Sequence, residues 1–226
     1  HRAMSAAIFT KKNKSLTVLV TCGPRREPLD PVRFLSNRST GTLGFALARA
    51  FAGRGHRVLL AAGPITVPAD FGPRVRVLRF ETARDLRKLA VKESKRCDVI
   101  CMTAAVADFR PASLSSSKIK RGKSALTIKL IPNPDILAEL GRLKRPGQVL
   151  VGFSVESSQH EARAKDKLLR KNLDLIAVQR VGRQNPFGLN PMHTTLIGRK
   201  GVISRHNSIS KPHLAKTVVR LSTPSL

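Results

Sequence analysis

A polar hexapeptide, Ser36-Asn37-Arg38-Ser39-Thr40-Gly41, stands directly before apolar residues at helical spacing. A helix N-terminus presents unpaired N–H groups and the positive end of the helix dipole, and the hydroxyls and the guanidinium add further donors. This combination predicts a site that holds a phosphate. The same residues would also serve as an N-cap that satisfies the first helical turn, and the hexapeptide alone leaves both interpretations open.

The segment that follows Met102 combines small residues with one acid, Asp108. Small residues let a ligand lie against the backbone, and a carboxylate at a strand end can accept hydrogen bonds from ribose hydroxyls or help to hold Mg²⁺. A cap or a salt bridge is the alternative for Asp108. The loop beyond it concentrates cations between positions 118 and 123, which either close over a polyphosphate or form a solvated basic surface.

Two lysines, Lys167 and Lys171, stand one helical turn apart on a predicted helix and therefore share a face. Their ammonium groups repel each other mildly unless an anion lies between them. The alternative is a charged face whose only role is solubility. By itself the pair is weak support for an anion site.

The elements that must position these residues alternate between apolar β-rich runs and helical stretches, which is typical of parallel strands joined by crossover helices. We predict a Rossmann-like, three-layer α/β/α fold with a mostly parallel sheet, both faces covered, and a C-terminal hairpin and helix. Strands are expected over 16–21, 56–62, 75–80, 98–105, 126–131, 148–154 and 174–178, helices over 41–54, 82–93 and 158–171 and after Asn133 and Ser210, and the hairpin over 194–204.

The carboxyl ends of such strands meet at one edge of the sheet, so the segments after Thr21, Met102 and Phe153 should converge on one crevice. No GxGxxG motif is present, and Gly23-Pro24-Arg25 lacks the glycines that a dinucleotide needs for close approach. The sequence therefore argues against an ordinary NAD-dependent oxidoreductase.

Length and composition predict one soluble domain over residues 15–226, with residues 1–14 disordered or a remnant of a linker or of cloning. No apolar run is long enough to span a membrane, and the three cysteines form no CxxC motif, so a reducing, cytoplasmic location is expected. The net charge of +28 attracts polyanions, but the cations are spread along the chain and Tyr and Trp are absent. Charge alone therefore predicts only non-specific binding of nucleic acid.

Taken together, several segments resemble the phosphopantothenate–cysteine ligase family, also called phosphopantothenoylcysteine synthetase, the C-terminal domain of the bacterial DNA/pantothenate metabolism flavoprotein. The resemblance runs from about Leu16 to the end of the chain. It is carried, in the family's order and spacing, by REPLDPVRFLSNRSTG (26–41), AAVADFRP (104–111), KIK (118–120), NPDIL (133–137), VGFSVES (151–157) and KLLRKNLDLI (167–176).

The resemblance implies a reaction that joins 4′-phosphopantothenate to L-cysteine in coenzyme A biosynthesis. CTP would be the activating substrate, through an acyl-cytidylate, with Mg²⁺ as the expected ion. It also implies a homodimer, no flavin in this chain, and a separate flavin-dependent decarboxylase as a possible partner, the usual decarboxylase domain being absent before residue 1. The ATP-using branch of the family is the enzymatic alternative, and a non-catalytic, basic polyanion-binding protein on this fold is the alternative from another class.

Site residues follow from the same resemblance. Asn37 matches the asparagine that hydrogen-bonds the acyl-cytidylate, and Lys118 matches the lysine required for the nucleotide-dependent chemistry. Arg33 and Ser39 are candidates for the substrate-phosphate region. The positions expected to bind CTP are Met102, Thr103, Ala104, Asp108, Lys118, Pro134, Asp135, Ile136, Leu137, Phe153, Lys167 and Lys171.

The chain departs from the family's pattern at three places, which involve four residues. Pro24 and Arg25 stand in a loop that is usually Gly-Gly-Thr, so they stiffen it, remove an N–H and add charge. Gln179 stands where asparagine is typical, and Arg121 follows KIK in place of lysine. Because none of these positions is Asn37 or Lys118, activity is expected to survive, with an altered substrate affinity.

Overall fold

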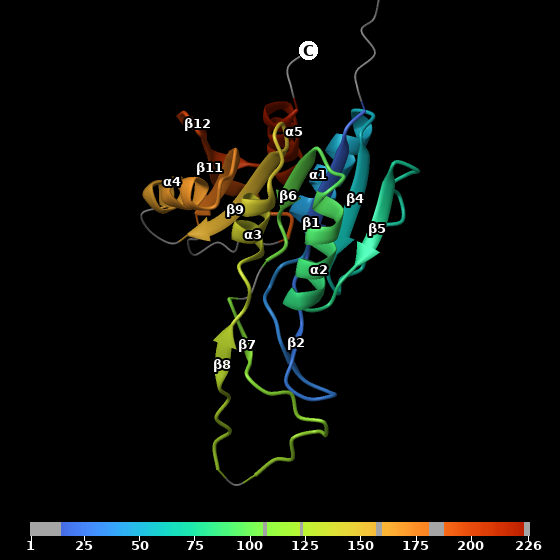
Figure 1. The fold of residues 1–226 in the computed structure, drawn as a ribbon, viewed down its shortest axis with the longest axis vertical. Coiled ribbons are helices and arrows are strands. Elements are labelled where there is room, and N and C mark those ends of the chain that lie inside the picture. Colours follow the sequence, from blue (N-terminus) through green and yellow to red (C-terminus); the bar gives the residue numbers. More distant parts are fainter. Residues whose placement is uncertain (1–14, 106–107, 123, 157–159, 181–187, 224–226) are drawn as a thin grey trace, which may run out of the picture.

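The computed structural model describes residues 15–105, 108–122, 124–156, 160–180 and 188–223. Its centre is an eight-stranded sheet in the order β12-β11-β10-β9-β6-β1-β4-β5 (Figure 1). The sheet strands are β1 (Thr17–Cys22), β4 (Arg57–Ala62), β5 (Val75–Arg79), β6 (Val99–Met102), β9 (Val149–Glu156), β10 (Leu175–Arg180), β11 (Met192–Gly198) and β12 (Gly201–Ile209).

The strands from β5 to β10 pair in parallel, and β11 and β12 add an antiparallel hairpin at one edge. The chain passes from β1 to β4 on one side of β1 and later returns to β6 on its other side, so the strand order reverses at β1 and β6. Ligands of doubly wound sheets bind at such a reversal, outside the carboxyl ends of the strands. The predicted mostly parallel Rossmann-like sheet with a C-terminal hairpin and helix is confirmed.

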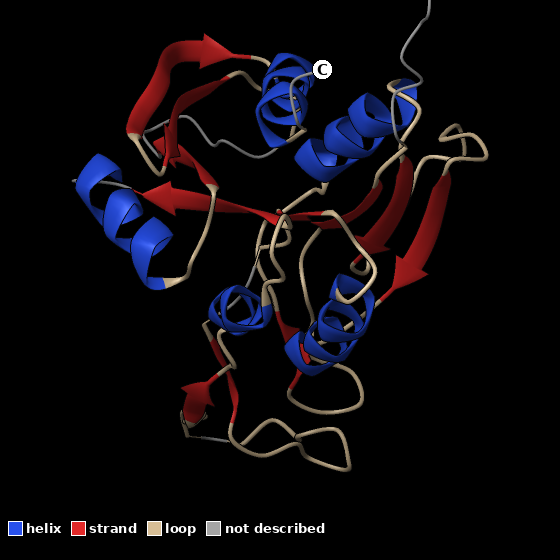
Figure 2. Cartoon of the chain, turned by 45° about the horizontal axis from the view of Figure 1, so that its top comes forward, coloured by secondary structure: helices blue, strands red, loops and turns tan. Residues whose placement is uncertain are grey.

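Helices cover both faces of the sheet, as Figure 2 shows. On one face, α1 and α5 pack through Phe51 and Leu214 onto the core that includes Val20. On the other face, α2, α3 and α4 bury Leu86, Leu140 and Leu168 against it. The helices are α1 (Thr42–Gly53), α2 (Ala83–Ser94), α3 (Ile136–Leu143), α4 (His160–Arg170) and α5 (Lys211–Ser222).

Two pairs of short strands lie outside the sheet: β2 (Glu27–Pro28) with β3 (Phe34–Leu35), and β7 (Phe109–Pro111) with β8 (Leu130–Pro132). We call residues 109–132, other than the undescribed residue 123, the arm. In Figure 1 the arm extends away from the sheet in green, beside β2. Of the helices in the described part of the chain, none is long and apolar enough to cross a membrane.

Three expectations about elements were wrong in detail. The edge strand β5 is not covered on both faces, since Arg76 and Val77 are exposed; its apolar spacing predicts a strand but not its place at the edge. Only residues 130–132 of the expected strand at 126–131 form a strand. Asp135, and not Asn133, caps α3, because the Asp135 carboxylate accepts the N–H of Ala138 at 3.0 Å.

Candidate functional site

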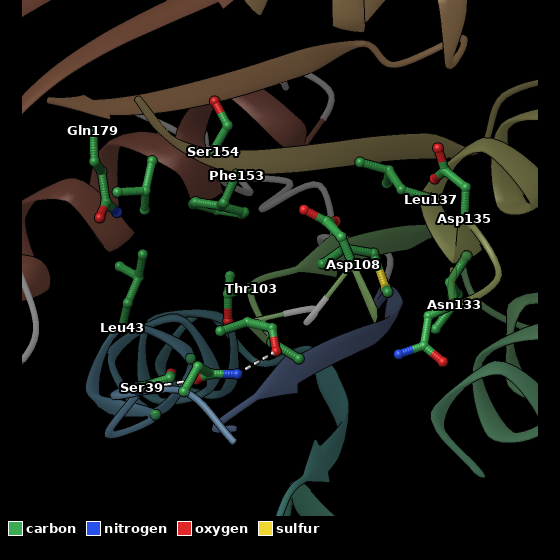
Figure 3. A pocket seen from close by; sticks show the side chains of 18 of the residues that line it. Ser39, Leu43, Thr103, Asp108, Asn133, Asp135, Leu137, Phe153, Ser154 and Gln179 are labelled. Carbon is green, nitrogen blue, oxygen red and sulfur yellow. Dashed lines mark hydrogen bonds between the residues drawn. The ribbon is translucent and has the colours of Figure 1, made fainter. Parts of the chain in front are cut away.

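A cavity of about 620 Å³ opens at the carboxyl ends of β6, β9 and β10, next to the start of α1 (Figure 3). The expected convergence of the segments after Thr21, Met102 and Phe153 is therefore observed. The sequence-predicted residues that line the cavity are Asn37, Ser39, Met102, Thr103, Ala104, Asp108, Pro134, Asp135, Ile136, Leu137, Phe153, Lys167 and Lys171.

The start of α1 forms one wall of the cavity, through residues 41–44. Gly41 is the N-cap with φ +76°, no side chain caps the first turn, and no acidic residue lies in it. The free N–H groups at this end carry the positive end of the helix dipole and suit an anion. The phosphate interpretation of the hexapeptide thus gains support over a side-chain N-cap.

Asn37 ties the hexapeptide to the end of β6. Its Nδ2 donates to the carbonyl oxygen of Ala105 at 2.9 Å, and its Oδ1 accepts the N–H of Ser39 at 3.0 Å. Both hydrogen bonds fix the amide plane, and the residue is half-buried at the cavity wall. A fixed amide donor at this position is what stabilisation of a developing negative charge requires.

The backbone after β6 is held against the end of β1. The hydroxyl of Thr103 donates to the carbonyl oxygen of Thr21, and the N–H of Ala104 donates to Thr21 Oγ1 at 3.1 Å. The N–H of Ala105 then donates to the carbonyl oxygen of Gly23 at 3.1 Å. These contacts give the cavity a floor of backbone and small side chains.

Lys167 lies in α4 and Lys171 directly follows the helix, and each has a carboxylate of its own. Lys167 Nζ lies 3.2 Å from Glu156 Oε1, and Lys171 Nζ lies 2.7 Å from Asp135 Oδ2. Burial raises the pKa of Asp135, but hydrogen bonds from Lys171 and from the N–H of Ala138 outweigh burial and hold the pKa below its ordinary value. The repulsion expected between the two lysines is therefore relieved by separate ion pairs on this side of the cavity.

Arg25, one of the departures from the family's pattern, is fully buried. Burial lowers the pKa of its guanidinium, while the charges of Glu27 and Asp108 oppose that shift. Glu27 also accepts the N–H of Ala83 at 2.9 Å, at the start of α2. The added charge thus lies in the interior, where the charges of Glu27 and Asp108 act on it, and not on the surface of a loop.

Sequence reasoning missed several residues that line the cavity. Asn133 stands within the NPDIL segment and Gln179 was noted only as a departure, so both had a signal that could have been used. In Figure 3, Gln179, Phe153 and Leu43 gather at one end, and Asn133 lies at the other. Ser154 and Lys211 also line the cavity, and nothing in their local sequence predicted it.

The cysteines do not contribute a reactive thiol. Cys22, Cys97 and Cys101 are free and buried. Burial raises the pKa of Cys22 and of Cys97 to about 12. The thiols therefore stay protonated at neutral pH.

Lys118 and Arg33 do not line this cavity within one chain. They line a second hollow of about 940 Å³, on the arm, together with Lys120 and Arg121. Asp30 fastens the arm there. Its carboxylate accepts the N–H of Ile119 at 3.1 Å and both Nε and Nη2 of Arg33, and Arg33 Nη2 also donates to the carbonyl oxygen of Ile119 at 2.6 Å.

Asp30→Asn is expected to loosen the arm and to accelerate cleavage by trypsin after Lys118, Lys120 or Arg121. The hydrogen bond from Arg33, followed by those from backbone N–H groups, holds the pKa of Asp30 below its ordinary value, so the ionised carboxylate fastens the arm. Limited proteolysis read by mass spectrometry measures the effect. Asp70→Asn, which removes an exposed ion pair with Arg49, is the control; equal cleavage rates in both variants would contradict the expectation.

The amino-acid sequence of this chain is similar to a known protein family and to several known proteins. The chain matches the family described as "DNA/pantothenate metabolism flavoprotein C-terminal domain" over residues 13–223. It is 40% identical over 185 residues to the "Coenzyme A biosynthesis bifunctional protein CoaBC" of Escherichia coli (strain K12), covering 80% of this chain and 45% of that protein. It is 38% identical over 204 residues to a "Cysteine/Cysteine sulfinic acid decarboxylase" of an unknown prokaryotic organism, covering 90% of this chain and 56% of that protein.

The chain thus spans about half the length of these curated relatives. Among solved structures, the crystal structure of the C-terminal domain of Coenzyme A biosynthesis bifunctional protein CoaBC is similar with a TM-score of 0.76 at 29% identity, covering 91% of this chain and 92% of that chain. The chain therefore belongs to the family of the DNA/pantothenate metabolism flavoprotein C-terminal domain, which is the phosphopantothenate–cysteine ligase family.

Proposed function

We propose that this chain is a CTP-dependent ligase of the cytoplasm that joins 4′-phosphopantothenate and L-cysteine to 4′-phosphopantothenoylcysteine in coenzyme A biosynthesis. The observation that carries the proposal is one cavity that combines the uncapped start of α1, the fixed amide of Asn37, and two lysines, Lys167 of α4 and Lys171 directly after it. These groups suit a reaction in which two anionic substrates must be held together.

The chemistry needs charge neutralisation more than a nucleophilic side chain. A carboxylate is a poor electrophile, so its oxygen first attacks the α-phosphorus of CTP, pyrophosphate leaves, and an acyl-cytidylate forms. The cysteine amine then attacks the acyl carbon, the amide bond forms, a proton is released and CMP leaves. Asn37 would donate its amide N–H to the oxygen that carries negative charge in these steps.

The nucleotide would lie along the edge formed by β6, β9 and the start of α3. Phe153 would lie against the base, and Asp108 would accept hydrogen bonds from the ribose. In nucleotide sites Mg²⁺ takes one or two carboxylates together with phosphate oxygens, and Asp108 and Asp135 are the carboxylates that line this cavity. The ion would neutralise phosphate charge when the nucleotide is bound.

Lys118 and Arg33 require a second copy of the chain in this proposal. Lys118 lies on the arm, which extends away from the sheet (Figure 1), and Arg33 lines the same hollow beside it. In a homodimer, which the resemblance implies, the arm of one copy would bring both cations to the cavity of the other. Cations supplied in this way would close over the nucleotide's phosphates.

The first test is pyrophosphate release from CTP and from ATP, with 4′-phosphopantothenate and Mg²⁺, with and without cysteine. Release that prefers CTP supports the proposal, and a strong preference for ATP would assign the chain to the ATP-using branch. If pyrophosphate is released from neither nucleotide, the ligase assignment is wrong. RNA binding that persists at physiological salt would then favour the polyanion-binding alternative, because incidental charge attraction is steeply salt-sensitive.

Mixing two inactive variants tests the shared site. Asn37→Ala and Lys118→Ala are each expected to be inactive alone, whereas an equimolar mixture that exchanges subunits should recover about a quarter of wild-type activity. Half of the dimers then contain one subunit of each variant. In each of these dimers, one of the two sites has both Asn37 and Lys118, so a quarter of all sites are intact. A mixture that exchanges subunits, as shown by mass spectrometry, yet stays inactive would place Lys118 in the site of its own chain.

A further inference from the structure

Glu27 of β2 is a carboxylate in the interior of the protein, with only 3% of its surface exposed. A buried carboxylate is costly unless hydrogen bonds and an opposite charge compensate it. Its Oε1 accepts the N–H of Ala83 at 2.9 Å and Nδ2 of Asn133 at 3.3 Å. Glu27 therefore connects the start of α2 with the segment that leads into α3.

The opposite charge comes from Arg25, which is fully buried. Burial lowers the pKa of its guanidinium, and the charges of Glu27 and Asp108 counter that shift. One buried cation therefore acts both on a carboxylate in the interior and on a carboxylate that lines the cavity. Apolar side chains at positions 25 and 27 would avoid burying two charges, so packing alone does not account for this pair.

Asn133 carries the connection from Glu27 to Asp108. The N–H of Asn133 donates to the carbonyl oxygen of Asp108 at 2.8 Å, which continues the pairing of β7 with β8. Its Oδ1 lies 3.3 Å from Nη1 of Arg110, which donates to it. Asn133 and Asp108 both line the cavity and are labelled in Figure 3. Glu27 thus restrains Asn133, and Asn133 restrains the backbone of Asp108.

We propose that Glu27 is a positioning residue for the nucleotide: it holds Asn133 and thereby keeps the Asp108 carboxylate where the ribose hydroxyls can reach it. The inference rests on the proposed function, in which Asp108 accepts hydrogen bonds from the ribose. Glu27 lines no part of the cavity, so it acts on the nucleotide only through these residues. Hydrogen bonds weaken steeply when distance and angle change, so a small displacement of Asp108 costs affinity.

The test is isothermal titration calorimetry of wild type, Glu27→Asp and Asn133→Ala with CTP, 2′-deoxy-CTP and 3′-deoxy-CTP. Glu27→Asp keeps the charge that acts on Arg25 but withdraws the acceptor oxygen from Asn133 by one methylene. Wild type should bind CTP about tenfold or more tightly than at least one deoxy nucleotide, the usual worth of a hydrogen bond to a charged group.

In both variants the affinity for CTP should fall towards that for the deoxy nucleotide, while the affinity for the deoxy nucleotide itself changes little. A merely structural role would lower both affinities alike. The double variant should lose no more CTP affinity than either single variant, because the two residues form one connection and their effects are not additive.

Thr82→Ala is the matched control. It removes the capping box at the start of α2, where Glu27 also accepts a hydrogen bond, and leaves Asn133 in place. Its melting temperature should fall while its preference for CTP over the deoxy nucleotides stays at the wild-type value.

Three results would overturn the inference and leave the ligase proposal intact. In the first, Glu27→Asp or Asn133→Ala keeps the wild-type preference for CTP. In the second, either variant loses affinity for CTP and for the deoxy nucleotides equally. In the third, wild type binds CTP no more tightly than either deoxy nucleotide. A wild-type protein that does not bind CTP would overturn both the inference and the proposed function.

Discussion

Asn37→Ala is expected to lower kcat for 4′-phosphopantothenoylcysteine formation by about 100- to 1,000-fold, the usual loss when one donor to a developing oxyanion is removed. The amide of Asn37 is fixed by Ala105 and Ser39, so its remaining N–H can point into the cavity without reorganisation. The affinity for CTP should change much less than kcat, because the donor acts mainly on the charge that forms during the reaction. Steady-state kinetics together with calorimetric CTP binding measure both quantities.

Two variants control for a local collapse of the loop. Asn37→Asp keeps an oxygen that can accept the Ser39 N–H but loses the donor, so it should be nearly as slow as Asn37→Ala. Arg38→Ala alters an exposed neighbour that lines no part of the cavity, so it should retain most of the activity. The role assigned to Asn37 fails if Asn37→Ala keeps more than about a tenth of wild-type kcat, given the effect expected for such a donor.

Gly44→Ala is expected to lower the free energy of unfolding by about 1–3 kcal/mol, the usual cost of overpacking a core. A Cβ at this position would lie 2.3 Å from Cys22 Cβ and 3.0 Å from Thr103 Oγ1, so α1 would have to move away from β1. Alanine is the better helix former by up to about 1 kcal/mol, which offsets only part of this cost. Urea denaturation measures the change.

The same substitution should weaken CTP binding, because Gly44 belongs to the wall that α1 gives the cavity. Gly53→Ala is the matched control in the same helix. No atom lies within 4 Å of the Cβ that it would add, so it should leave stability unchanged or raise it by about 0.5–1 kcal/mol. Equal stabilities of Gly44→Ala and Gly53→Ala would show that the contact of α1 with β1 is not as tight as described.

Much of the fold could be predicted because its signals are local. The apolar run at 16–21 predicts β1, and the helices predicted over 82–93 and after Ser210 are α2 and α5. In the structure Thr82 caps α2 and Ser210 caps α5. The edge position of β5 and the short β8 could not be predicted in this way. Both depend on which strands pair and where pairing stops, and that is decided by residues far away in the chain.

The amino-acid pattern predicts the alternation of strands and helices and the convergence of strand-end segments at one edge of a parallel sheet. The family resemblance adds half of the residues that line the cavity, 13 of 26. The folded chain is needed to show that Lys118 lines a hollow on the arm, that Arg25 is buried where the charge of Asp108 acts on it, and that Lys211 lines the cavity. The sequence shows which residues are charged, but it does not show what surrounds each charge in the folded protein. Burial, ion pairs and the direction of a helix dipole at each charge arise from segments that come together only on folding.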